Sequence, residues 1–169
     1  MSKVIKTHVK LNVKQLYEFT LYNTYRGLFG IISVITIVLS LALLITGINQ
    51  EGTIKKILIF VILIIFAGVI PYLMYKQAEV YLKNSPIYKD GLLYEIDDNE
   101  IRVHNDDQII SSPWKKVYNA IETKNSFYLY TQNLGAIILP KNYVDEDYEL
   151  IKKYIIRNVK GAHKKLKKK

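Results

Sequence analysis

Residues 28–48, LFGIISVITIVLSLALLITGI, and residues 57–75, ILIFVILIIFAGVIPYLMY, decide the fold of this chain. Neither run contains a charged side chain. At a rise of 1.5 Å per residue, helices of these lengths reach about 31 Å and about 28 Å, and the hydrocarbon core of a bilayer is roughly 30 Å thick. Surface helices of soluble proteins keep a polar face, which both runs lack. The sequence therefore predicts two transmembrane helices.

The segment between the runs, TGINQEGTIKK at residues 46–56, contains Gly47, Asn49 and Gly52, which favour a tight turn. The two helices are therefore expected to form an antiparallel hairpin, with both ends of the chain on one side of the membrane. The nearby basic residues are Lys10, Lys14 and Arg26 before the hairpin, Lys76, Lys83 and Lys89 after it, and Lys55 and Lys56 in the loop. By the positive-inside rule, this distribution predicts that both termini are cytoplasmic.

The hairpin contains few groups that could carry out chemistry. Its polar side chains are Ser33, Thr36, Ser40 and Thr46. Transporters and proton pumps place charged or histidine side chains inside the membrane, so we interpret this hairpin as an anchor. Pro71, which closely follows Gly68, is expected to kink the second helix near its cytoplasmic end.

Charge is distributed unevenly outside the hairpin. Residues 76–151 contain 13 acidic and eight basic side chains, whereas residues 152–169 contain nine basic side chains and no acidic one. The basic isoelectric point therefore arises from the chain ends, which argues against a general nucleic-acid-binding surface. The chain has no cysteine, which excludes disulfides, thiolate nucleophiles and cysteine-bound metals.

The residues before the hairpin predict a strand and then a helix. Residues 3–11, KVIKTHVKL, alternate as a strand does. Asn12 can cap a helix that ends near Gly27, with Gln15 at the reciprocal position of a capping box, and this helix is expected to run into the first span. Its apolar stripe consists of Tyr17, Leu21, Tyr25 and Leu28. The bilayer surface and the chain's own soluble domain are both candidates to cover that stripe.

The segment after the hairpin predicts a series of short strands. The expected strands are residues 92–96, 101–104, 109–112, 114–122, 127–131 and 136–139. Six strands at this spacing predict an antiparallel sheet that curls toward a barrel. An amphipathic helix is expected from Asp145, as its N-cap, to Gly161, and would cover the open end of the barrel. Strands followed by a C-terminal helix are the order of a pleckstrin-homology-like fold.

The predicted fold class is therefore an α+β membrane protein, in which a two-helix transmembrane hairpin accompanies a small antiparallel β-barrel-like domain with a C-terminal capping helix. The expected ranges are 1–27 for an N-terminal strand and juxtamembrane helix, 28–75 for the hairpin with spans at 28–48 and 57–75, 76–160 for a pleckstrin-homology-like cytoplasmic domain, and 161–169 for a polybasic tail.

Several residues of this domain resemble those of a known family. They are Trp114, the pair Glu122 and Thr123, and the run Ile137, Ile138, Leu139, Pro140 and Lys141. Together with the hairpin they resemble the YcxB-like family of bacterial membrane proteins over nearly the whole chain, residues 3–160. The resemblance implies a bacterial source and a domain related to bacterial pleckstrin-homology modules. It implies no catalytic residue, and the lysine tail lies outside the family's pattern.

The sequence offers no motif for catalysis or for a metal. His8, His104 and His163 lack metal-ligand spacing, and scattered surface histidines explain them. The acidic residues Asp97, Asp98, Glu100, Asp106 and Asp107 lack the spacing and central Gly of a calcium loop, and hairpin turns favour Asp in any case. Neither a Gly-rich phosphate loop nor a nucleophile elbow is present. We therefore expect a protein that is not an enzyme and uses no cofactor.

The candidate binding residues are lysines. Trp114 is expected in the core because an indole buries a large area, but its neighbours Lys115 and Lys116 could contact an acidic headgroup or peptide. The tail KGAHKKLKKK, residues 160–169, is predicted to be disordered, and each lysine beside an anionic leaflet would contribute about 1 kcal/mol of attraction. Its lysines beyond the helix are Lys164, Lys165, Lys167, Lys168 and Lys169. A solvated tail without a partner is the alternative interpretation.

The sequence thus predicts a multi-pass interaction or regulatory protein of the bacterial inner membrane, with both termini cytoplasmic. Its folded domain is expected to bind a protein partner or an anionic lipid headgroup. A second copy of the chain is a further candidate partner, whereas nucleic acid is disfavoured because the folded part has no RNA-binding motif. The alternative function is an accessory subunit of a membrane transport or immunity complex that assembles through the hairpin.

Overall fold

The structure is a computed structural model of the whole chain, and the residues that it describes are 3–46, 52–85, 90–105, 108–159 and 164–166. The chain forms two compact units. Unit 1 comprises residues 1–15 and 83–169, and unit 2 comprises residues 16–82. Unit 2 is therefore an insertion in the sequence of unit 1.

The first sheet of unit 1 is antiparallel. It contains β1 (Ile5–Val9), β2 (Leu92–Ile96), β3 (Glu100–Asn105) and β4 (Gln108–Pro113), in that order. Burial alternates along β1 and β2, because successive side chains of a strand point to opposite faces. The strand predicted in residues 3–11 is confirmed. It pairs with β2, although unit 2 separates these two strands in the sequence.

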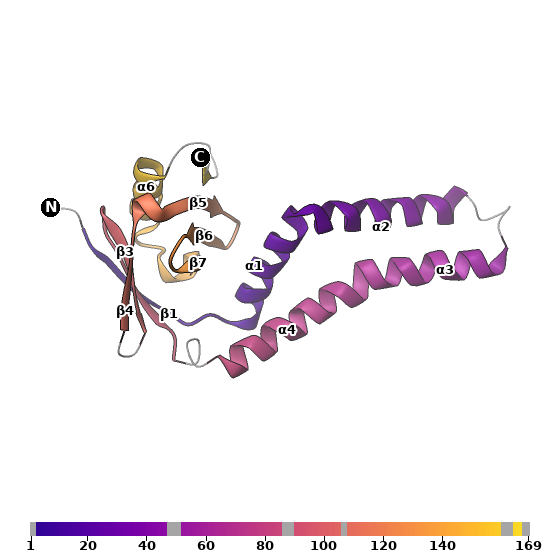
Figure 1. Cartoon of the computed structure of the whole chain (residues 1–169), viewed down its shortest axis with the longest axis horizontal. Coiled ribbons are helices and arrows are strands. Elements are labelled where there is room, and N and C mark those ends of the chain that lie inside the picture. The colour runs from indigo at the N-terminus through magenta and orange to yellow at the C-terminus, as the bar shows by residue number, and fades with distance from the viewer. Residues whose placement is uncertain (1–2, 47–51, 86–89, 106–107, 160–163, 167–169) are drawn as a thin grey trace. The chain divides into compact units, whose positions relative to one another are not determined.

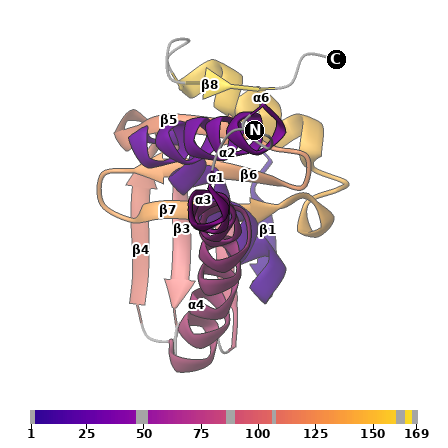
Figure 2. The same cartoon turned by 90° about the vertical axis from the view of Figure 1, so that its right-hand side faces the viewer.

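The second sheet of unit 1 contains β5 (Val117–Glu122), β6 (Ser126–Thr131) and β7 (Gly135–Pro140), all antiparallel. The short strand β8 (Lys164–Lys165) pairs in parallel with β5. A 3-10 turn, η2 (Trp114–Lys116), connects the two sheets. Figure 2 shows the strands of one sheet running across those of the other.

The six strands predicted after the hairpin are confirmed, but the predicted barrel is wrong, because the described strands form two separate sheets. The physical reason lies at Pro113, where β4 ends. A proline has no amide hydrogen to donate to a ladder, and the 3-10 turn that follows it redirects the backbone before β5 begins.

Helix α6 (Tyr148–Asn158) connects with both sheets of unit 1. The hydroxyl of Tyr154 donates to the backbone carbonyl of Lys3, beside β1, at 2.7 Å. The side-chain amide of Asn158 donates to the backbone carbonyl of Asp98 at 3.2 Å. The hydroxyl of Tyr148 donates to Glu122 of β5 at 2.7 Å. These contacts hold the helix over the junction of the sheets.

The predicted N-cap of this helix, Asp145, lies two residues before the observed one. A 3-10 turn, η3 (Lys141–Tyr143), follows β7, and the N-cap position belongs to Asp147, whose side chain makes no capping hydrogen bond. That carboxylate instead accepts from the Lys3 ammonium at 2.6 Å. The predicted stop at Gly161 lies outside the described residues, and α6 itself ends at Asn158.

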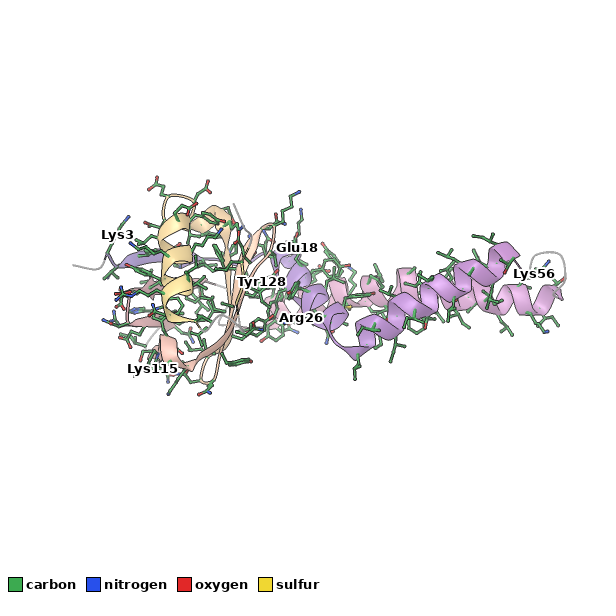
Figure 3. All side chains as sticks on the ribbon, turned by 90° about the horizontal axis from the view of Figure 1, so that it is seen from above. Lys3, Glu18, Arg26, Lys56, Lys115 and Tyr128 are labelled. Carbon is green, nitrogen blue, oxygen red and sulfur yellow. The ribbon has the colours of Figure 1, made fainter. Side chains whose placement is uncertain are left out.

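The apolar core of unit 1 draws on both sheets and on α6. Its largest fully buried side chains include Ile5, Ile96, Ile101, Ile121, Phe127, Tyr128, Leu129, Leu139, Ile151 and Ile155. Tyr128, which Figure 3 labels, belongs to β6, the strand between β5 and β7. β1 contributes to this core as β2 and β3 do, so unit 1 needs both of its sequence segments.

Helix α1 (Val13–Arg26) begins at the capping box that the sequence predicts. The N–H of Gln15 donates to Asn12 Oδ1 at 2.9 Å, and the N–H of Asn12 donates to Gln15 Oε1 at 3.0 Å. The prediction that this helix runs into the first span is wrong, because a bend at Gly27 separates α1 from α2 (Leu28–Thr46). Gly30 permits the bend, since a Cβ at this position would overlap the backbone of Tyr25.

The second long helix is continuous from Thr53 to Asn84. It consists of α3 (Thr53–Ile64), the π-helical segment η1 (Ile65–Val69) and α4 (Ile70–Asn84). The N–H of Ile70 donates to the carbonyl of Ile65, the spacing that defines a π-helical turn. The irregularity predicted near Pro71 is therefore a local change in helix winding just before that residue, whose ring obstructs regular α-helical packing.

Helices α2 and α3 lie side by side in unit 2 (Figure 1). Both long helices are long and apolar enough to cross a membrane. In α2 only the small residues Gly30, Ser33 and Ser40 are buried, and α3 has no buried residue. The large apolar side chains point outward instead, as Leu39 at 57% exposure and Leu58 at 57% illustrate. The turn residues Gly47 and Asn49 lie outside the described residues.

Candidate interaction site on strand β5

Two of the predicted binding residues lie at the start of β5. Lys115 and Lys116 lie in η2, directly before β5, and both side chains are exposed. Figure 3 labels Lys115 on the surface of unit 1. We define the β5 site as η2, β5 and the short strand β8.

Trp114 fixes the position of these two lysines. Its side chain is buried, and its Nε1 donates to the carbonyl of Asp97 at 2.8 Å. The backbone N–H of Trp114 donates to the carbonyl of Asn99 at 3.2 Å. The indole therefore anchors η2 to the β2–β3 turn, in agreement with the core position expected for it.

The tail contributes its backbone to the same site. Lys164 and Lys165 pair with Ala120 and Ile121 of β5, so the prediction that the tail is disordered is wrong for these two residues. The physical reason is that an edge strand offers unpaired backbone groups to any extended segment within reach. Lys167, Lys168 and Lys169 lie outside the described residues.

The far end of β5 carries a buried carboxylate, that of Glu122, whose side chain has no exposed area. Glu122 Oε1 accepts from Lys141 Nζ at 2.6 Å and from the Tyr148 hydroxyl at 2.7 Å. Glu122 Oε2 lies 3.6 Å from Lys152 Nζ. Residues from β5, from η3 and from α6 are thereby joined at one charged centre.

Aromatic rings surround this charged centre. The Lys141 ammonium lies 5.0 Å from the ring centroid of Tyr148 and 5.3 Å from that of Phe127. Burial opposes the charge of Lys152, but the hydrogen bond with Tyr148 and the nearby Glu122 carboxylate outweigh it, and the pKa of Lys152 is raised. The arrangement sets two ammonium groups against one buried carboxylate, which suits a structural bridge between sheet and helix.

In the predicted acidic group, Asp97 stabilises the β2–β3 turn. Asp97 Oδ1 accepts from the N–H groups of Asn99 and Glu100 at 2.7 Å and 2.9 Å, and Oδ2 accepts from Arg102 at 3.0 Å. Asp98 pairs with Arg157 at 2.7 Å. Asp106 and Asp107 lie outside the described residues. Within the described part of the chain, no cluster of acidic or histidine side chains could hold a metal ion.

A ladder of charges covers the outer face of the first sheet. Glu95 accepts from Lys6 at 2.6 Å, and its other oxygen lies 3.4 Å from Arg102 and 3.5 Å from His104 Nε2. The hydrogen bond with Lys6 is the largest cause that lowers the pKa of Glu95. Of the remaining histidines, His8 is exposed on β1 and His163 lies outside the described residues.

Sequence reasoning missed the bridge at Glu122. Its local signal is the spacing of Tyr148 and Lys152, which places both on one face of α6. Their common partner on β5 has no local signal, because the contact joins residues 26 positions apart.

Comparison with known proteins matches part of the chain to a protein family. No curated protein and no solved structure matches the chain. A protein-family model described as YcxB-like protein matches residues 96–155. This region contains Trp114, Glu122 and Lys141, which carry the resemblance and which the structure places at the β5 site and its buried bridge. Residues 96–155 are therefore similar to the YcxB-like family, in agreement with the resemblance for this part of the chain, and the match does not include the apolar helices.

Proposed function

We propose that the chain is a membrane-anchored interaction protein of the bacterial inner membrane. Unit 2 is the anchor, and unit 1 is a pleckstrin-homology-like domain that binds anionic lipid headgroups through the β5 site. The observation that carries this proposal is that β5 assembles two separate basic segments. The exposed Lys115 and Lys116 precede it, and the backbone of Lys164–Lys165 lies along it.

The architecture of unit 1 supports a pleckstrin-homology-like domain. Strands β1 to β4 form one sheet, β5 to β7 form the core of the second, and α6 follows as the C-terminal helix. Domains of this order bind ligands with exposed residues of their sheets and loops, and they need no catalytic group. The binding role therefore fits a site made of lysines and backbone groups.

The exposed apolar side chains of α2 and α3 support the anchor. In a bilayer, lipid would remove these side chains from water, and no protein partner would be needed to cover them. With two spans, both ends of the chain face one compartment, and the basic residues outside the hairpin favour the cytoplasm. The anionic cytoplasmic leaflet is then an available ligand for the lysines.

A vesicle assay tests the ligand. The full chain is placed in nanodiscs of zwitterionic lipid, and its co-sedimentation with vesicles rich in phosphatidylglycerol is measured at rising salt. We expect binding that salt weakens, because exposed charges are screened. The variant Lys115→Gln/Lys116→Gln should bind more weakly than the charge-matched variant Lys10→Gln/Lys153→Gln, in which exposed lysines outside the β5 site are changed. Equal binding by both variants would contradict the role of the β5 site.

A labelling experiment tests the orientation. The chain has no cysteine, so single probes at Gln50→Cys and Lys168→Cys report one site each. In intact cells, a membrane-impermeant maleimide should label the probe at position 50 and leave the probe at position 168 unlabelled. The opposite pattern would place unit 1 outside the cytoplasm and remove the leaflet as its ligand.

A further inference from the structure

Strand β4 is an edge of the first sheet. The order β1, β2, β3, β4 leaves one side of β4 without a paired strand in the part of the chain that the structure describes (Figure 2). All of residues 108–111 are exposed, Ile109 by 65% and Ile110 by 41%. β1, the other edge strand, instead contacts η3, where the hydroxyl of Thr7 donates to the carbonyl of Tyr143 at 2.8 Å. The open edge of this sheet is therefore that of β4.

Two hydrogen bonds identify the backbone groups that face this edge. The side-chain amide of Asn133, in the β6–β7 turn, donates to the carbonyl of Ser111 at 2.6 Å, so this carbonyl points away from β3. The N–H of Trp114 donates to the carbonyl of Asn99, just before β3, at 3.2 Å and so points the other way. Successive residues of a strand direct their backbone groups to opposite edges. The residues of β4 whose backbone groups face the open edge are therefore Ile109, Ser111 and Pro113.

These three residues offer an asymmetric set of hydrogen-bonding groups. Ile109 offers an N–H and a carbonyl. Ser111 offers its N–H, and its carbonyl can accept a second hydrogen bond beside that from Asn133, because a carbonyl oxygen has two lone pairs. Pro113 has no N–H and offers only its carbonyl. A strand that pairs with this edge must therefore place a donor, and needs no acceptor, opposite Pro113.

A second copy of β4 meets this requirement when it runs antiparallel and is centred on Ser111. Ile109 of each copy then lies opposite Pro113 of the other, and its N–H can donate to the proline carbonyl. The two Ser111 residues lie opposite each other and can exchange hydrogen bonds. Strand addition of this kind satisfies groups that an open edge otherwise leaves to water.

The side chains of β4 also permit this pairing. Natural edge strands commonly carry charged side chains, which oppose pairing with another copy. β4 has none, whereas β1, β2 and β3 each carry at least one. On one face of the joined sheet, Ile109 would lie across from Pro113 of the second copy. On the other face, Ile110 would lie across from the small Ser112, and apolar side chains at such cross-strand positions stabilise a sheet.

We infer that β4 is a homodimer interface, at which two copies of the chain pair their β4 strands antiparallel about Ser111 and join their first sheets into one. The contact is isologous, because each copy contributes the same residues. It goes beyond the proposed lipid binding and uses no residue of the β5 site. Anchoring of both copies in one membrane would raise their effective concentration, so a short interface of this kind can suffice.

Cysteine crosslinking tests the interface, because the chain has no cysteine of its own. Membranes that contain the full chain with the single probe Ser111→Cys are treated with a short bismaleimide. Crosslinked dimer should form about tenfold faster than with Lys124→Cys, an exposed position in the β5–β6 turn, because pairing holds the two probes together. Ile109→Cys should crosslink more slowly than Ser111→Cys, since each Ile109 lies opposite Pro113 and not opposite its own copy.

A charge at the edge should break the dimer. In the Ser111→Cys chain, Ile109→Lys should slow crosslinking about tenfold, because an edge lysine opposes strand addition. Val4→Lys is the matched control and should leave the rate unchanged, since Val4 is a 43% exposed apolar residue just before β1, the other edge strand.

A proline tests the backbone pairing itself. Ser111→Pro removes the N–H that faces the open edge and spares the bonds between β3 and β4, as proline does on the solvent side of an edge strand. Copies labelled at Lys124→Cys with donor or acceptor fluorophores are mixed in vesicles. Energy transfer between them should fall, in the Ser111→Pro chain, to the level of copies that do not associate. An unchanged melting temperature shows that each variant is folded.

Each contrary outcome overturns a stated part of the inference. Crosslinking of Ser111→Cys no faster than that of Lys124→Cys would overturn the interface. Faster crosslinking at Ile109→Cys than at Ser111→Cys would overturn the register about Ser111. Dimers that persist in the Ile109→Lys and Ser111→Pro chains would assign the contact to another surface. A crosslinked product that contains a different protein would overturn the second copy as the occupant and assign the edge to that protein.

Discussion

Glu122 is a fully buried carboxylate whose two lysine neighbours both retain some exposure. Lys141 is 20% exposed and Lys152 is 11% exposed, so each ammonium keeps part of its hydration while it compensates Glu122. Burial of an unpaired carboxylate is very costly, and hydrogen bonds together with opposite charges offset that cost. The residue therefore works as a connector of β5, η3 and α6.

Replacement of Glu122 tests this connection. Glu122→Gln removes the buried charge that faces Lys141 and Lys152, so the free energy of unfolding should fall by roughly 3 kcal/mol. Urea unfolding of the full chain in detergent, followed by the fluorescence of Trp114, the chain's one tryptophan, measures the change. The exposed Glu146→Gln variant is the control and should change stability by less than about 0.5 kcal/mol. Equal effects of the two variants would contradict a stabilising bridge.

Glu95 predicts a pH dependence of stability. Its pKa in the folded chain is lowered, chiefly by Lys6, from an ordinary value near 4.5. A carboxylate of this kind stabilises the fold above its ordinary pKa, and the contribution is lost as the pH falls through the folded pKa. Glu95→Gln should therefore reduce stability at pH 7 and flatten its decline below about pH 4.5. Thermal unfolding across that range measures both effects, and an unchanged pH profile would contradict the assignment.

At the scale of elements, regular helices and strands follow local patterns closely. The predicted capping box is present because Asn12 and Gln15 bond to each other's backbone within one turn. Boundaries that depend on distant contacts are less predictable. The N-cap of α6 is Asp147 and not the predicted Asp145. The Asp147 carboxylate pairs with Lys3, near the other end of the chain.

The bend between α1 and α2 gives a prediction about glycine. Gly30→Ala should lower the melting temperature of the full chain in detergent, because the added Cβ would overlap the backbone of Tyr25 and force the bend to open. Gly68→Ala is the matched control, since a Cβ at Gly68 meets no atom within 4 Å. Alanine also favours a helix over glycine by about 1 kcal/mol, so this control should be neutral or stabilising. Similar losses in both variants would show that the bend does not need Gly30.

At the scale of the whole molecule, the main feature is the interruption of unit 1 by unit 2. β1 precedes the apolar helices in the sequence, and β2, its neighbour in the first sheet, follows them. Both ends of unit 2 must therefore lead back to the same folded unit. This connectivity suits the proposed membrane anchor, a hairpin whose two ends would lie on one side of the bilayer.

The interruption predicts that the N-terminus stabilises a domain whose other strands all follow unit 2. Ile5 is 2% exposed in β1, and Ile5→Ala should lower the stability of unit 1 by about 2–4 kcal/mol. His8→Ala, on the exposed face of the same strand, is the control and should have a small effect. Denaturant unfolding followed by Trp114 fluorescence reports on unit 1. Equal stability of the Ile5 variant and the wild type would show that β1 is dispensable.

The sequence by itself determined the two apolar helices, the strands of unit 1 and the turn roles of its acidic residues, because hydrophobic runs, alternation and turn chemistry act over a few neighbouring positions. Only the tertiary structure decided that β1 joins β2, that Glu122 meets Lys141 and Tyr148, and that Lys164–Lys165 lie on β5. These pairings join residues far apart in the chain. Their free energy comes from backbone groups and charges that are satisfied only after the sheets and α6 have assembled, so no local pattern encodes them.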